Sequence, residues 1–397
     1  MKLYILIFLP VLLFGETLTT LIENAKNSHT SLETIKQRVA TLNNEYDISR
    51  NFEDPSLSFN ISDIQFADPM NRGLEAMQYS SISLKQKIPY FGKRDANSKK
   101  VDAKKDEITL SLELSKVKLV ESIKTTAYSI WQIEEILKIT NEYIDLTKHN
   151  IELYSNYGSN DTKSHMSIMS AEMTLSELKI KKSQLSNSLM GFYKKLSYLS
   201  AMNVKSLELN MSVSTPKTIA FYINSKTTNL SYKLKEASLK VANEDIKVKE
   251  LSSAIDPIVQ VGYYYREKYK DYANIGISFS VPLYGTQSSR TMISKKLALS
   301  SKSEVTDLSG LLVSQISQTH ASLINFYDIY NIIQNQSMPQ IEHMFELSSS
   351  YVKNGEELLI YISLLEKKLS LDEKNIEVIA NFHKTKAILG ALIGESK

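Results

Sequence analysis

The chain of 397 residues is long enough for two or three ordinary domains, yet it contains only 12 glycines and 8 prolines. These are about 3% and 2% of the residues, against a usual ~7% and ~5%, so turns are few and the secondary-structure elements must be long. The net charge of +3 is spread along the sequence without the basic tracts typical of nucleic-acid binding. The absence of cysteine excludes disulfides, thiolate metal sites and a lipid-modified N-terminal cysteine.

The N-terminus is typical of an export signal. Lys2 precedes an apolar run from Leu3 to Phe14, and the sequence becomes polar at Glu16. The run of about 12 residues is too short to cross a bilayer as a helix, and no later stretch approaches about 18 apolar residues. We therefore expect residues 1–15 to be a signal peptide, although a buried helix start is an alternative.

The first half predicts a helix, a β-hairpin and a long helical hairpin. Apolar residues at steps of three and four indicate a helix at about 16–50, and period-two alternation indicates a hairpin at about 55–89 with one apolar and one polar face. A helical pattern then runs from about 95 to 154 and would be about 90 Å long at 1.5 Å per residue. The chain turns near Gly158, and a returning helix follows to about residue 199.

The second half repeats this order. A helix is expected at about 217–253, a hairpin at about 257–283, and a long helix at about 287–353 that Pro339 should kink. The chain turns again near Gly355, and a last helix runs to about residue 394. The two strand-exit prolines, at 89 and 282, are 193 residues apart, and the two turn glycines are 197 apart. The sequence thus predicts two structural repeats, 16–205 and 206–397.

The alternating strands suit the wall of a membrane β-barrel, with an apolar lipid face and a polar lumen face. Four strands cannot close such a barrel, and open sheet edges are not tolerated in lipid, so several chains would have to share one barrel. A soluble four-stranded sheet packed under helices is the alternative.

Two duplicated phrases carry a resemblance to a known family. Each lies where a predicted strand meets a long helix: Ile88-Pro89-Tyr90-Phe91-Gly92-Lys93-Arg94 and Val281-Pro282-Leu283-Tyr284-Gly285. Three further features match the same family. They are the helix turns at 154–158 and 351–355, the proline at position 339, and the pattern of leucines and glycines near the C-terminus at 387–394. Over nearly all of its mature length the chain resembles the TolC-like outer-membrane efflux protein family.

The resemblance implies a mainly α fold with a β-barrel part. Three chains would each give four strands to one twelve-stranded transmembrane β-barrel in the outer membrane. Their long coiled-coil helices would form a tunnel through the periplasm. The protein would be a passive exit duct for efflux or type I secretion, working with a periplasmic adaptor (a membrane fusion protein) and an inner-membrane transporter, with no enzymatic activity, cofactor or bound metal.

The resemblance implies three sets of functional residues: the barrel-to-helix corners, the adaptor contacts and the periplasmic gate. The barrel-to-helix corners are Pro89, Gly92, Pro282 and Gly285. The adaptor contacts are the turns at Gly158, Asn160, Gly355 and Glu356. The periplasmic gate is Tyr361 and Leu364, because this chain has these residues six and nine positions beyond Gly355, where some family members carry gate aspartates.

The six histidines are scattered, no pair has the spacing of a helical metal site, and no nucleophile–base–orienter set is visible. A second function class stays open, a periplasmic coiled-coil scaffold or adaptor without its own pore. It would explain the helical hairpins but not the amphipathic strands. The sequence does not indicate the transported substrate.

Overall fold

The computed structural model describes residues 16–157, 162–351 and 355–395, and it divides the chain into two compact units. The sheet unit contains Thr34–Leu112 and Ser231–Ser309, and the hairpin unit contains the rest of the chain. Each unit therefore combines segments from both halves of the sequence. The predicted signal peptide lies outside the described residues, and the predicted division into two repeats stays a prediction.

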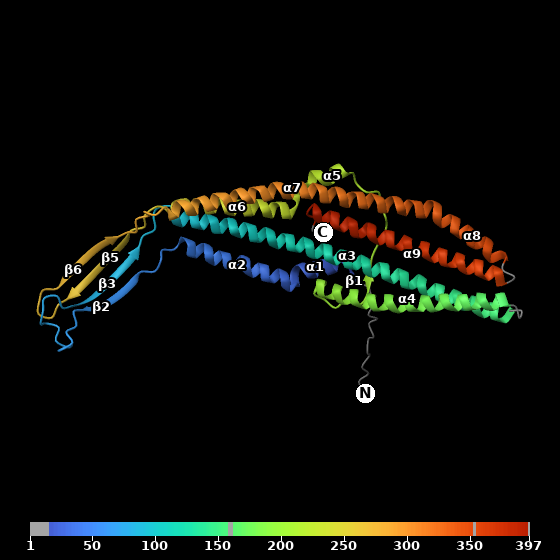
Figure 1. Cartoon of the computed structure of the whole chain (residues 1–397), viewed down its shortest axis with the longest axis horizontal. Helices are drawn as coiled ribbons and strands as arrows, with labels where there is room; N and C mark the ends of the chain where they lie inside the picture. The colour runs from blue at the N-terminus through green and yellow to red at the C-terminus, as the bar shows by residue number, and fades with distance from the viewer. Residues whose placement is uncertain (1–15, 158–161, 352–354, 396–397) are drawn as a thin grey trace, which may run out of the picture. The chain divides into compact units, whose positions relative to one another are not determined.

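The fold is mainly α with a small antiparallel sheet, as expected (Figure 1). The helices are α1 (Leu18–Ser28), α2 (Thr30–Arg50), α3 (Lys93–Tyr157), α4 (Thr162–Ser200), α5 (Ile219–Asn224), α6 (Leu230–Leu251), α7 (Thr286–Ile332), α8 (Met338–Tyr351) and α9 (Gly355–Leu392). The strands are β1 (Glu16–Thr17), β2 (Ser56–Ser62), β3 (Tyr79–Lys87), β4 (Leu207–Glu208), β5 (Ile258–Tyr265) and β6 (Tyr272–Ser278). Strands β1 and β4 form a short parallel pair in the hairpin unit.

Both predicted β-hairpins are present in the sheet unit and join into one sheet. The strand order is β2-β3-β5-β6, and all neighbours are antiparallel. The two hairpins meet at β3 and β5, where Ile82 pairs with Tyr263 and Leu84 with Val261. Strands β2 and β6 are therefore the two edges of the described sheet.

The fourth strand ends earlier than the alternation predicted. We expected β6 to continue through Phe279 to Val281, but its ladder stops where Ser278 pairs with Ile258. The residue before Ile258 on the partner strand β5 is Pro257, which has no N–H to donate to a further pair. In the chain that follows β6, Pro282 restricts the backbone conformation of the residue before it. Phe279 therefore lies beyond the paired strand.

In the hairpin unit, the buried core is made of apolar residues on facing helices. One cluster joins α5, α7 and α9 through Tyr222, Ile316, Leu323, Phe382 and Leu389. A second cluster joins α3, α4 and α9 through Tyr143, Ile144, Leu178 and Leu365. The apolar stripes at helical spacing thus hold neighbouring helices together.

Helices α4 and α9 run parallel and pair at equivalent positions of the two sequence halves. The Thr174 hydroxyl donates to the Glu366 carboxylate at 2.8 Å, and one heptad further on Lys181 forms an ion pair with Glu373. Both pairs are separated by 192 residues in sequence, close to the 193 residues between the strand-exit prolines. Both contacts thus join residues whose spacing in sequence is close to that of the two strand-exit prolines.

In the sheet unit, polar contacts join antiparallel helices. Lys100 of α3 contacts Asp245 of α6 at 2.6 Å, and Lys240 contacts Asp106 at 2.9 Å, so the helices run in opposite directions. The hydroxyl of Ser294, on α7, donates to the same Asp245. One carboxylate thus links three helices.

Two long predicted helices are interrupted. The helix expected at 16–50 breaks at His29, whose backbone is extended and whose Nδ1 lies 2.7 Å from the Ser31 hydroxyl, a local bond that competes with helix continuation. The helix expected at 217–253 is divided into α5, a 3₁₀ turn (Ser225–Thr228) and α6. Asn229 lies between the 3₁₀ turn and α6, and its side-chain amide donates to the Leu392 carbonyl at 2.7 Å.

The kink expected at Pro339 has a structural counterpart. A π-helical segment, Ile333–Ser337, separates α7 from α8 directly before this proline. Proline lacks the N–H for the i→i−4 bond and its ring crowds that carbonyl, so a wider turn relieves the conflict.

Candidate functional site

The two predicted corners between strands and helices share one backbone geometry. Gly92 has φ +90° and Gly285 has φ +69°, in the left-handed region that favours glycine. Each glycine carbonyl accepts the first bond of the helix that follows, from Ala96 N at 2.8 Å and from Ser289 N at 3.0 Å. Both glycines are thus the start points of the long helices α3 and α7.

The first corner is fixed by an ion pair. Lys93 Nζ lies 2.7 Å from Asp256 Oδ1 and donates to the Ala254 carbonyl at 2.6 Å, and the same Asp256 oxygen accepts from Tyr90 N at 2.7 Å. Burial of this carboxylate acts to raise its pKa, but the bonds from Lys93 and Tyr90 outweigh burial and hold the pKa of Asp256 below its ordinary value. These contacts join the end of β3 to the start of β5. A backbone hydrogen bond from Ile88 N to the Pro257 carbonyl, at 2.9 Å, connects the same two segments.

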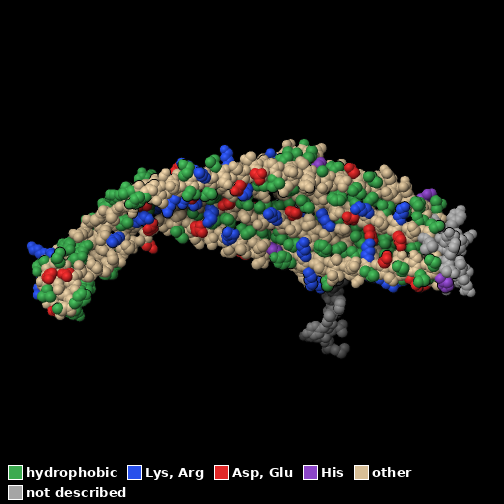
Figure 2. Space-filling model, viewed as in Figure 1, with side chains coloured by type: hydrophobic (Ala, Val, Ile, Leu, Met, Phe, Trp, Pro, Cys, Tyr) green, Lys and Arg blue, Asp and Glu red, His purple; other side chains and the backbone are tan. Residues whose placement is uncertain are grey.

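The sheet carries an apolar face that no part of the sheet unit covers. The strand register places one cross-strand row of Leu57, Leu84, Val261 and Ile275 on the same face. Their exposed fractions are 55%, 46%, 49% and 79%. Figure 2 shows hydrophobic side chains over the strand region. Such a patch on a folded chain marks an interaction surface or a membrane surface.

The opposite face of the sheet is mostly polar. Ser58, Ser83, Gly262 and Asn274 form the neighbouring row, and the Ser58 and Ser83 hydroxyls lie 3.1 Å apart. Every strand contributes to both faces, so the sheet as a whole is amphipathic.

The candidate tip and gate residues are only partly described. Gly158 and Asn160 lie outside the described residues, as does the side chain of Glu356, while Gly355 is the first residue of α9. Tyr361 and Leu364 are half-buried on α9, beside the buried Ile362 and Leu365. The Tyr361 ring packs against Phe345 of α8, with centroids 5.2 Å apart.

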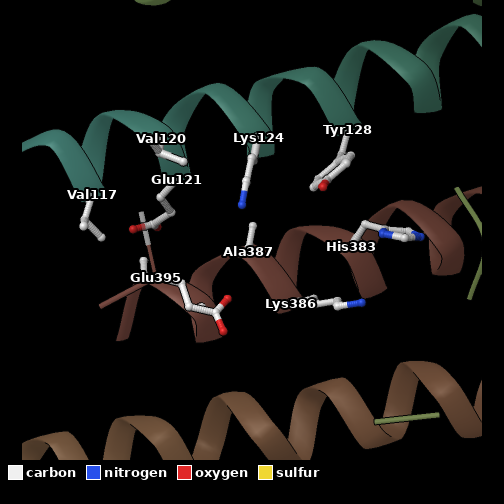
Figure 3. A pocket seen from close by; sticks show the side chains of 11 residues that line it. Val117, Val120, Glu121, Lys124, Tyr128, His383, Lys386, Ala387 and Glu395 are labelled. Carbon is white, nitrogen blue, oxygen red and sulfur yellow. The ribbon is translucent and has the colours of Figure 1, made fainter. Parts of the chain in front are cut away.

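A cavity of about 130 Å³ lies in the hairpin unit between α3 and α9. Figure 3 shows Glu121 and Lys124 of α3 reaching toward α9, with Glu395 on the far side. Burial raises the pKa of Glu121 and lowers that of Lys124, which the nearby Glu395 partly restores. A volume of this size holds about four waters at about 30 Å³ each, so the cavity fits a hydrated packing gap better than a substrate site.

Sequence reasoning missed this cavity, and it also missed an open groove of about 420 Å³ between α8 and α9. Lys367 and Lys374 line the groove together with Ile341 and Met344. The cavity and the groove both depend on which helices pack against each other. The hydrophobic periodicity of a single helix does not show which helix its neighbour will be.

Within residues 16–157, 162–351 and 355–395, no cluster of three or more histidine and carboxylate side chains is arranged to hold a metal ion. Among the described helices, none combines the length and hydropathy that a bilayer crossing requires.

The fold matches solved structures of outer-membrane channels. The outer membrane protein VceC of Vibrio cholerae aligns with a TM-score of 0.77 and 11% identity, over 95% of this chain and 96% of that chain. The CmeC outer membrane channel of Campylobacter jejuni aligns with a TM-score of 0.78 and 12% identity, over 96% and 86%. The open state of the MtrE outer membrane channel of Neisseria gonorrhoeae gives a TM-score of 0.73 and 14% identity, over 96% and 90%.

No protein-family model matches the chain, and no curated protein matches it in sequence. The structural match covers nearly the whole chain, so the chain shares its fold, with long helices and a small strand part, with these solved channels. The fold expected from the TolC-like resemblance is confirmed.

Proposed function

We propose that this protein is an outer-membrane channel-tunnel, the passive exit duct through which an efflux pump or a type I secretion system releases its substrates. The uncovered apolar face of the β2-β3-β5-β6 sheet is the observation that carries this proposal. The likeness to solved outer-membrane channels supports it.

The sheet supplies the argument for the membrane and for more than one chain. An apolar face with a polar opposite face is the pattern of a strand between lipid and a water-filled lumen. Open strand edges are costly in lipid, so β2 and β6 need partners from other chains. Three copies give a closed barrel of twelve strands, above the minimum of about eight.

The long helices give the duct its periplasmic part. Helix α3 has 65 residues and would be about 98 Å long at 1.5 Å per residue. In the proposed trimer, the helices surround a tunnel through the periplasm. The turns near Gly158, Asn160, Gly355 and Glu356 meet a periplasmic adaptor, and Tyr361 and Leu364 narrow the entrance. An inner-membrane transporter drives the substrate.

A coiled-coil scaffold without a pore is the competing function. The long helices suit both functions. A scaffold, however, has no use for a four-stranded sheet that exposes Leu57, Leu84, Val261 and Ile275 on one face. The duct explains this face and is the better account.

Fractionation of cells that produce the full chain tests the proposal. The duct predicts heat-modifiable trimers in the outer-membrane fraction, and crosslinkers placed at Asn160 or Glu356 should capture a periplasmic adaptor. A chain that stays in the soluble periplasmic fraction would favour the scaffold. Labelling of Asn160 from the cell exterior would show that the topology is inverted.

A further inference from the structure

Three methionines form an exposed stripe on α4. Met166, Met169 and Met173 are exposed by 66%, 64% and 67%. Three of the 12 methionines of the chain thus fall within eight residues. At about 100° per residue, steps of three and four place these side chains within about 60° of one another around the helix.

The stripe is not the face by which α4 packs into the hairpin unit. The buried residues of this part of α4 are Ser167 and Ala171, with Leu178 further along. Their positions lie roughly opposite the methionines at about 100° per residue. The core of the hairpin unit therefore does not require thioether side chains at these three positions.

A histidine extends the stripe. His165 is exposed, directly precedes Met166 and lies four residues before Met169. Residues three or four apart on a helix have Cβ atoms about 5–6 Å from each other, close enough for two side chains to reach one ion. Met169 stands three or four positions from each of the other three residues, so it is the central member of the set.

We propose that Met169, together with Met166, Met173 and His165, binds a soft monovalent cation, Cu(I) or Ag(I). Thioether sulfur is a soft ligand that selects Cu(I) over the harder divalent ions, and imidazole also suits copper. The set spans about 12 Å along the helix, so Met169 shares the ion with one or two of its neighbours at a time. With no cysteine in the chain, thioethers and imidazoles are its soft ligands. This inference does not depend on the proposed function.

The competing explanation is a contact surface, because methionine is also frequent at adaptable protein interfaces. Leucine separates the two, since it keeps the volume and apolar character of methionine but lacks the sulfur. A metal site must fail when all three methionines become leucine, whereas a contact surface should tolerate the change.

The experiment titrates the purified full-length protein in detergent with silver nitrate in chloride-free buffer, followed by calorimetry. The wild-type chain should bind one Ag(I) per stripe, and the M166L/M169L/M173L variant should lose this binding while keeping its oligomeric state. Since outer-shell changes alone weaken metal sites about 10–100-fold, M169L should lower the Ag(I) affinity by at least about tenfold. Excess Zn(II) should not displace the silver.

Met190 provides the matched control. It lies on the same helix and is exposed by 60% but is far from the stripe, so M190L should leave Ag(I) binding unchanged. Equal Ag(I) affinity in the triple variant and the wild type would overturn the proposal. Absence of Ag(I) binding by the wild-type chain would overturn it as well.

Discussion

In the hairpin unit, single residues determine where helix α9 ends and how the stability of the fold depends on pH. Gly394 has φ +81°, and a Cβ atom on it would lie 2.9 Å from the Thr228 carbonyl oxygen. The Thr228 hydroxyl in turn donates to the Ile393 carbonyl at 2.7 Å. The C-terminal end of α9 is therefore closed by a glycine in a left-handed conformation and by the polar segment that precedes α6.

Replacing Gly394 by alanine should destabilise the chain by about 1–2 kcal/mol, the cost of a left-handed conformation for a residue with a Cβ, with the contact to Thr228 adding to it. Chemical denaturation of the purified protein measures the change. Gly310 is the matched control. It lies inside α7 with open space around its Cα, so G310A should stabilise by about 0.5–1 kcal/mol. Equal effects of the two changes would contradict this explanation.

His383 should make stability depend on pH. It is buried beside Tyr128 and Phe382, and burial lowers its pKa from the ordinary 6.5 despite hydrogen bonding to the backbone at Met211. Below pH 6.5 the unfolded chain gains a proton at this position while the folded chain stays neutral until its lower pKa is reached. Protonation therefore favours unfolding, and stability is lost as the pH falls.

The variant H383N should flatten the fall in Tm between pH 6.5 and about pH 5, whatever its absolute Tm. Thermal unfolding followed by circular dichroism at several pH values measures the slope. The exposed His149 is the control, and H149N should keep the wild-type slope. An unchanged slope in H383N would show that another group is responsible.

At the scale of elements, the sheet gives the sharpest test of the membrane face. Ile275 is exposed by 79% in the middle of β6, and Asn274 beside it points to the opposite face. Arginine at a lipid-facing position near mid-membrane costs about 2–4 kcal/mol. I275R should therefore reduce the yield of assembled protein in the outer membrane, whereas N274R should assemble normally. Heat-modifiability on gels measures assembly, and equal tolerance of both variants would exclude a lipid-facing sheet.

Much of this element pattern could be predicted from the sequence. Period-two alternation predicted both hairpins, and the glycines at 92 and 285 predicted both corners, because only local chemistry is needed to specify them. The early end of β6 depends on Pro257 in the partner strand, and the break before α6 depends on the Asn229 contact to Leu392. These features involve residues that are distant in sequence, so local periodicity could not reveal them.

The candidate site was less predictable than the fold. The register of α4 with α9 and the ion pair between Lys93 and Asp256 join segments that periodicity treats separately. The tip residues Gly158 and Asn160 and the gate residues Tyr361 and Leu364 stay predictions. The methionine stripe was not predicted from the sequence, because the burial of the opposite side of α4 is needed to distinguish it from core packing.

For the whole molecule, we propose that several copies of this chain enclose a water-filled passage. An amphipathic four-stranded sheet with two open edges, attached to helices of up to 65 residues, accounts for both parts of such a passage. The same fold extends over 95% of the chain in the match to the outer membrane protein VceC.

The most direct test is ion conductance of the purified oligomer in planar lipid bilayers. We expect discrete, stable conductance steps, which N274R should change because it adds charge to the proposed lumen face. Arginine at the exposed Glu267, between β5 and β6, is the control for added positive charge away from the paired strands. Correctly assembled oligomers that insert into the bilayer without any conductance, or conductance identical in wild type and N274R, would show that the sheet does not line a water-filled passage.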